Sequence, residues 1–118
     1  MKRILIVDDE ADFREFVVRV AQGMGLQATA VGSGAEFRAV YDEVAPDAIV
    51  LDIVMPDEDG IELLNWLSEK GCAARVLIVS GYNPHYREMA HLLGGVKGLD
   101  VVTLPKPLEL EDLEAVLG

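Results

Sequence analysis

Acidic side chains stand at two places where an apolar run of the sequence ends. Asp8 and Asp9 follow the run 3–7, and Asp52 ends the run that begins at Ala48. If both runs are neighbouring strands, three carboxylates share one pocket, and repulsion pushes protons onto some of them unless a cation intervenes. Mg²⁺ suits this set because it binds one or two carboxylates, keeps waters and recruits phosphate oxygens. The backbone carbonyl of Val54 is the best-placed loop group to complete its shell.

A lysine and a hydroxyl extend this set toward phosphoryl transfer. Lys106 lies between two prolines after an apolar run, and Ser80 follows another. With Mg²⁺, the two side chains could surround three phosphoryl oxygens, and such a reaction otherwise needs only alignment and a nucleophile. A carboxylate is a known nucleophile that forms an acyl phosphate, and Asp52 is the central candidate. Since no general base is evident, we predict a phosphoacceptor with self-phosphorylation and autodephosphorylation only, not an enzyme.

Each motif also has a purely structural explanation. A single aspartate after a strand is often a turn residue or a helix cap. The acidic run 8–10 suits the positive end of a helix dipole. Neither explanation accounts for the arrival of Asp8, Asp9, Asp52, Ser80 and Lys106 all at the carboxyl ends of strands.

Five strands and five helices are expected to position these residues. Apolar runs and helical spacing predict strands at 3–7, 27–31, 48–52, 75–79 and 101–104, and helices at 11–24, 34–44 after a Ser33 cap, 60–70, 84–93 and 108–117. We expect the Pro- and Gly-containing segment after Asp52 to be a loop. Strict alternation implies an α/β fold, a doubly wound parallel sheet with helices on both faces. Ligands of such sheets lie beyond the carboxyl ends of the strands.

Composition limits the classes of protein that this chain can represent. The 118 residues suit one domain, 1–118, and no apolar run approaches the roughly 20 residues of a membrane span. The net charge of −11 argues against direct binding of nucleic acid or an anionic membrane. The N-terminus lacks a signal-peptide layout, and the single Cys72 fits a reducing cytoplasm. His85 and His91 lack the neighbours of a metal site.

These motifs together resemble the receiver domain of two-component response regulators. The resemblance covers nearly the whole chain and rests on a combination of motifs: Asp8-Asp9, Leu51-Asp52 with Met55-Pro56 and Gly60, Ser80-Gly81, and Lys106-Pro107. It implies a flavodoxin-like (CheY-like) (βα)5 fold with strand order 2-1-3-4-5 and a cis Lys106-Pro107 bond.

The resemblance also implies roles for residues and partners. Asp52 would accept phosphate from the phosphohistidine of a sensor histidine kinase or a histidine phosphotransfer protein. Asp8 and Asp9 would bind Mg²⁺, and Ser80 and Lys106 would contact the phosphoryl group. Phosphorylation would switch the conformation of the domain, which would then signal to an output domain or a downstream protein. A homodimer is one expected form of the domain.

The sequence departs from the family pattern at three places. Thr103 replaces the usual Tyr or Phe three residues before the lysine, so the usual aromatic swing is unavailable. The segment between Ser80 and Lys106 is longer than usual, with extra glycine-rich residues at 94–98. Val54 and Tyr82 occupy positions that often tune hydrolysis, and neither readily orients water. We therefore expect a longer-lived aspartyl phosphate than in receivers with polar residues there, which its decay rate in Mg²⁺ would measure.

Three rival classes remain for comparison. A pseudo-receiver would keep the fold as an interaction module without phosphorylation, and Thr103 favours it, whereas Asp9, Asp52 and Lys106 do not. A haloacid-dehalogenase-like phosphatase would need a second aspartate where this chain has Val54, and a nucleophile on its first strand. A flavin-binding protein of the flavodoxin type would need a hydroxyl-rich phosphate loop after the first strand.

Overall fold

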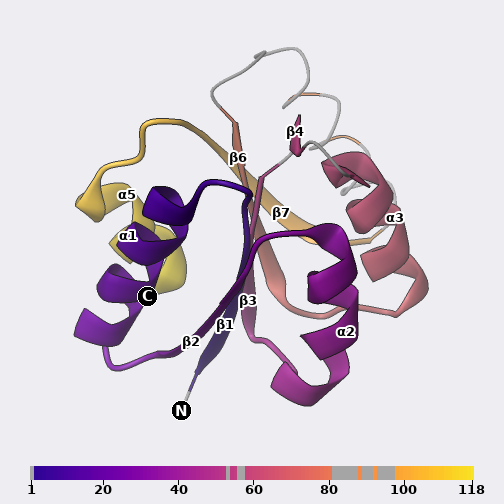
Figure 1. Cartoon of the computed structure of the whole chain (residues 1–118), viewed down its shortest axis with the longest axis horizontal. Helices are drawn as coiled ribbons and strands as arrows, with labels where there is room; N and C mark the ends of the chain where they lie inside the picture. Colours follow the sequence, from indigo (N-terminus) through magenta and orange to yellow (C-terminus); the bar gives the residue numbers. More distant parts are fainter. Residues whose placement is uncertain (1, 53, 56–57, 81–87, 89–91, 93–97) are drawn as a thin grey trace.

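A five-stranded parallel sheet with helices on both faces forms the molecule (Figure 1). The computed structural model describes residues 2–52, 54–55, 58–80, 88, 92 and 98–118. The strands of the sheet are β1 (Arg3–Val7), β2 (Gln27–Val31), β3 (Ala48–Asp52), β6 (Arg75–Ser80) and β7 (Asp100–Pro105). Their order is β2-β1-β3-β6-β7, which confirms the predicted order 2-1-3-4-5.

In the part of the chain that the structure describes, two pairs of helices cover the two faces of this sheet. The helices are α1 (Ala11–Gly23), α2 (Gly34–Val44), α3 (Gly60–Glu69) and α5 (Leu110–Leu117). Figure 1 shows α1 and α5 together on one face, and α2 and α3 on the other. The helix predicted at 84–93 falls almost wholly outside the described residues, as do Tyr82, His85 and His91. Within the described part of the chain, no helix has the length and apolarity needed to cross a membrane.

The core is divided in two by the sheet, following the alternation of side chains along each strand. In β1, Leu5 and Val7 pack toward α2 and α3, whereas Ile4 and Ile6 pack toward α1 and α5. The central strands β1, β3 and β6 are apolar on both faces because helices cover both. This explains why their sequences are continuous apolar runs.

Helix ends follow local capping chemistry. The Oγ of Ser33 accepts a hydrogen bond from the backbone N–H of Glu36 at 3.2 Å, so the predicted cap of α2 is confirmed. Helix α5 begins at Leu110, two residues later than predicted. Glu109 caps it in a reciprocal arrangement with Asp112, and the buried Leu108 precedes this cap as part of the core.

The segment after Asp52 differs from the predicted loop. It contains a short antiparallel pair, β4 (Val54–Met55) and β5 (Glu58–Asp59), in which Val54 pairs with Asp59 and Met55 with Glu58. A ladder of two residue pairs is too short to leave a periodic apolar pattern in the sequence. The β4–β5 pair therefore could not be predicted from the sequence.

Candidate phosphoacceptor and metal site

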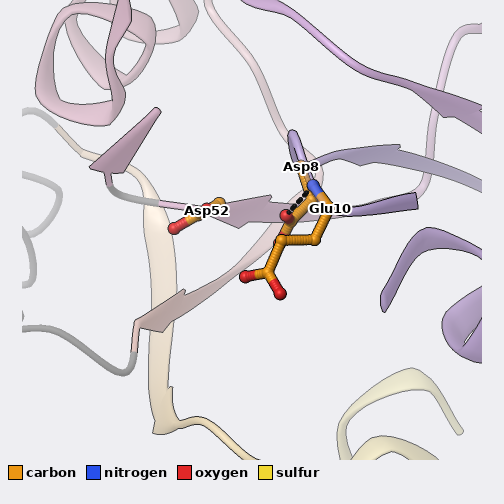
Figure 2. Close-up of side chains that lie close together, drawn as sticks. All are labelled: Asp8, Glu10 and Asp52. Carbon is orange, nitrogen blue, oxygen red and sulfur yellow. Dashed lines mark hydrogen bonds between the residues drawn. The ribbon is translucent and has the colours of Figure 1, made fainter. Parts of the chain in front are cut away.

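Two buried carboxylates lie side by side at the carboxyl edge of the sheet. Strands β1 and β3 are parallel neighbours with Val7 opposite Leu51, so the next residue of each chain segment, Asp8 and Asp52, reaches the same edge. Asp8 is 0% exposed and Asp52 is 5% exposed. They are the only buried charged residues in the described part of the chain. Figure 2 shows both with Glu10, which follows Asp8 after one residue.

Hydrogen bonds hold Asp8 in a single orientation. The backbone N–H of Glu10 donates to Asp8 Oδ1 at 2.8 Å (Figure 2), and Lys106 Nζ donates to Asp8 Oδ2 at 2.8 Å. The Asp8 backbone N–H donates to the carbonyl of Val31 at 3.2 Å. Both carboxylate oxygens of Asp8 therefore have partners, as a buried charge requires.

Lys106 supplies the positive charge of the site. Its Nζ lies 3.0 Å from Glu10 Oε1 and 3.7 Å from Asp52 Oδ2, in addition to its contact with Asp8. The ammonium also lies 4.5 Å from the centre of the Phe13 ring, within cation–π range. The Lys106-Pro107 peptide bond is cis, which confirms that expectation.

Burial and charge shift the pKa values of this pair. Burial raises the pKa of Asp8 above its ordinary value of 3.8, and the hydrogen bonds from Lys106 and Glu10 only partly oppose it. Burial alone would lower the pKa of Lys106, but hydrogen bonds to Asp8 and Glu10 and the charge of Asp52 raise it above 10.5. The half-buried ammonium of Lys106 thus faces acidic groups that favour its charged form.

Three carboxylates are close enough to share one metal ion. One oxygen each from Asp8, Glu10 and Asp52 lies within 4.8 Å of the others. Oxygen-only ligands of this kind fit Mg²⁺, which is a hard cation. Glu10 was not predicted as a ligand, since only the Asp8-Asp9 pair of the acidic run 8–10 was assigned to the metal. Its position two residues after Asp8, at the start of α1, is the signal that could have indicated it.

For the other predicted site residues, the structure gives mainly their position in the fold. Asp9 is exposed and does not belong to that three-carboxylate group, so its role as a ligand stays a prediction. Ser80 ends β6 and pairs with Pro105, which places its backbone beside the segment that leads to Lys106. The backbone of Val54 lies in β4, two residues after Asp52. Thr103 is half-buried in β7, opposite Ile78.

Comparison with known proteins identifies relatives over the full length of this fold. Residues 4–117 match the family model of the response regulator receiver domain. The chain is 33% identical over 115 residues to the transcriptional regulatory protein TrcR of Mycobacterium tuberculosis, covering 98% of this chain but only 43% of that protein. It is 31% identical to the chemotaxis protein CheY of Listeria monocytogenes, covering 97% of both.

A solved structure supports the fold independently. A CheY-like receiver domain protein of Methanospirillum hungatei superimposes with a TM-score of 0.87 at 24% identity, covering 99% of this chain and 90% of that one. The sequence motifs, the observed strand order and the match to the family model all indicate the same family. The chain belongs to the response regulator receiver domains of two-component systems.

Proposed function

We propose that this receiver domain is a phosphorylation switch in which Asp52 accepts a phosphoryl group in a Mg²⁺-dependent reaction. The observation that carries the proposal is the position of Asp52. It is a buried carboxylate at the end of the central strand β3, 3.7 Å from the ammonium of Lys106 and grouped with Asp8 and Glu10.

The donor is expected to be the phosphohistidine of a histidine kinase or a histidine phosphotransfer protein. An oxygen of Asp52 attacks phosphorus, the P–N bond breaks as the P–O bond forms, and the imidazole nitrogen takes up a proton. Lys106 and Ser80 would contact the phosphoryl oxygens, where charge develops in the transition state. An added charge of about −2 on Asp52 would then bias a two-state surface toward an output domain or partner.

The metal would be held by Asp8, Asp9 and Asp52, with Glu10 within reach and the Val54 carbonyl as a further ligand. When bound, Mg²⁺ neutralises charge on the phosphoryl oxygens and helps align them. This chain's own residues hold the acceptor oxygen in place and supply the ammonium of Lys106. We expect the switch to act in the cytoplasm, whose reducing conditions suit a chain with one cysteine.

Mass spectrometry after incubation with a small phosphodonor tests the proposal. The protein is treated with acetyl phosphate or phosphoramidate in Mg²⁺, and the Asp52→Asn variant is treated in parallel. We expect a mass increase of one phosphate that Asp52→Asn abolishes and that Asp42→Asn, a change at an exposed carboxylate of α2, retains.

Two other results would point to the rival classes. No phosphorylation with Mg²⁺ present would favour a pseudo-receiver that acts as an interaction module. Sustained release of phosphate from small phosphate esters over many turnovers would favour a phosphatase.

A further inference from the structure

Arg14 reaches from the first turns of α1 back to the main chain of Asp8. Its Nη1 donates a hydrogen bond to the Asp8 carbonyl oxygen at 2.6 Å, and the side chain is half-buried. A hydrogen bond from a charged donor is stronger than one between neutral groups. The hydrogen-bond partners of the Asp8 carboxylate oxygens are Glu10 and Lys106, not Arg14, so the influence of Arg14 on the site would pass through the backbone.

That bond fixes the peptide that joins Asp8 to Asp9. The Asp8 N–H is already held by the Val31 carbonyl at 3.2 Å, so Arg14 anchors the opposite side of the same residue. The Asp8 carbonyl belongs to the plane of the following peptide. Its orientation therefore sets the direction in which Asp9 leaves the strand and the direction in which Glu10 enters α1.

Gly32 has no side chain, and this leaves space for the Arg14 guanidinium. A Cβ placed on Gly32 would lie 3.2 Å from Arg14 Nη1 and 3.6 Å from its Cζ. The first distance is closer than side chains usually tolerate, so the guanidinium would have to shift by a few tenths of an ångström. Arg14 therefore lies against Gly32, in the connection between β2 and α2, and also hydrogen-bonds to Asp8.

We propose that Arg14 is a positioning residue for the Mg²⁺ site, and that a side chain at Gly32 would weaken this role by shifting the Arg14 guanidinium. The inference rests on the proposed function, since it presumes that Mg²⁺ binds at the carboxylate cluster that contains Asp8. Residues that do not bind the metal but hydrogen-bond to its ligands and orient them typically contribute tenfold or more to metal affinity.

Electrostatics alone predicts the opposite effect. Arg14 is a cation near a cation site, so removing its charge should strengthen Mg²⁺ binding. Loss of the anchor should weaken binding because the ligands lose their fixed orientation. The direction of the change in affinity therefore separates positioning from simple charge repulsion.

Isothermal titration of Mg²⁺ into the metal-free protein tests the inference with four variants. These are Arg14→Ala, Gly32→Ala, the two combined, and Arg19→Ala. Arg19 is an exposed arginine on the same helix, paired with Glu15, and serves as the matched control for lost charge. We expect Kd to rise roughly tenfold for Arg14→Ala, less for Gly32→Ala, and to stay unchanged for Arg19→Ala.

The combined variant makes the link between the two positions measurable. If Gly32→Ala acts by displacing Arg14, it should add little to Kd once Arg14 is already alanine. An unchanged or lower Kd for Arg14→Ala, or equal effects of Gly32→Ala in both backgrounds, would overturn the inference.

Wild-type behaviour distinguishes failure of this inference from failure of the proposed function. If wild type binds Mg²⁺ and is phosphorylated while Arg14→Ala binds Mg²⁺ equally well, only the role of Arg14 is wrong. If wild type neither binds Mg²⁺ nor is phosphorylated, the switch and the positioning role are both wrong.

Discussion

Lys106 occupies the position of a resident counter-cation among the carboxylates of the site. Its ammonium lies 2.8 Å from Asp8, 3.0 Å from Glu10 and 3.7 Å from Asp52. These are the same three residues that could hold a metal ion. If the proposed function holds, Lys106 and Mg²⁺ would compete for the charge of one acidic cluster, although both would favour a phosphorylated Asp52.

Lys106→Met should separate these two effects. Without the ammonium, Mg²⁺ binding should tighten because its competitor is gone, whereas phosphorylation by acetyl phosphate should slow by roughly a hundredfold because a transition-state contact is lost. Calorimetry and mass spectrometry measure the two quantities. Lys70→Met, which removes an exposed lysine paired with Asp42, is the control and should change neither. An unchanged rate of phosphorylation in Lys106→Met would contradict the role of Lys106.

Asp8 should make the stability of the metal-free protein depend on pH. Its folded pKa lies above the ordinary value of 3.8 because of burial, so the folded state holds the proton more tightly than the unfolded chain. The resulting stabilisation is complete below the unfolded pKa and is lost as pH rises through the folded pKa. At neutral pH the ionised carboxylate is therefore a cost to folding.

Asp8→Asn should remove that cost. In EDTA at neutral pH we expect the variant to be more stable than wild type, with the difference shrinking as pH falls toward 3.8. Chemical denaturation at a series of pH values measures it. A difference that stays constant with pH would mean that the titration of Asp8 is not its source.

At the scale of elements, the alternation of each strand also determines where the site opens. In β1 and β3, even-numbered residues such as Ile4, Ile6 and Val50 pack toward α1 and α5, and Asp8 and Asp52 continue this numbering. Val102 and Leu104 pack on the same side, and Lys106 follows them in step. The carboxylates and the lysine thus arrive on one face because the core requires their predecessors there.

This regularity explains what the sequence could predict. The strands and the edge at which Asp8, Asp52 and Lys106 meet follow from long apolar runs and from alternation with helices, whereas the strand order was expected only from the resemblance to receiver domains. Glu10 was not assigned, because it lies two residues after Asp8 and outside the Asp8-Asp9 pair on which the resemblance rests. The β4–β5 pair and the Arg14 contact depend on short-range geometry that leaves no periodic signal.

Helix α5 should contribute stability through its buried face. Leu113 is 0% exposed and lies in the core cluster shared with α1. Leu113→Ala should lower the free energy of unfolding by about 2–5 kcal/mol, because the lost side chain leaves a cavity. Glu114→Ala, on the exposed face of the same helix, should stay within about 0.5 kcal/mol. Urea denaturation measures both, and equal effects would mean that α5 is not packed as described.

At the scale of the whole molecule, acidic charge exceeds basic charge by a wide margin. The chain has 21 Asp and Glu against 10 Lys and Arg, for a net charge of −11. Such an excess destabilises the compact state through self-repulsion, which any salt reduces by screening. Stabilisation by MgCl₂ alone would therefore not demonstrate a specific site.

Comparison at equal ionic strength separates screening from binding. Mg²⁺ at a hundred times its Kd should add about 2.7 kcal/mol to the free energy of unfolding, beyond the effect of NaCl at the same ionic strength. Asp8→Asn should lose this excess and keep the NaCl effect, because it alters the site but barely changes the net charge. Asp42→Asn, which removes the same charge at an exposed position, should keep both. If MgCl₂ and NaCl stabilise wild type equally, the acidic cluster acts only as part of the general negative charge.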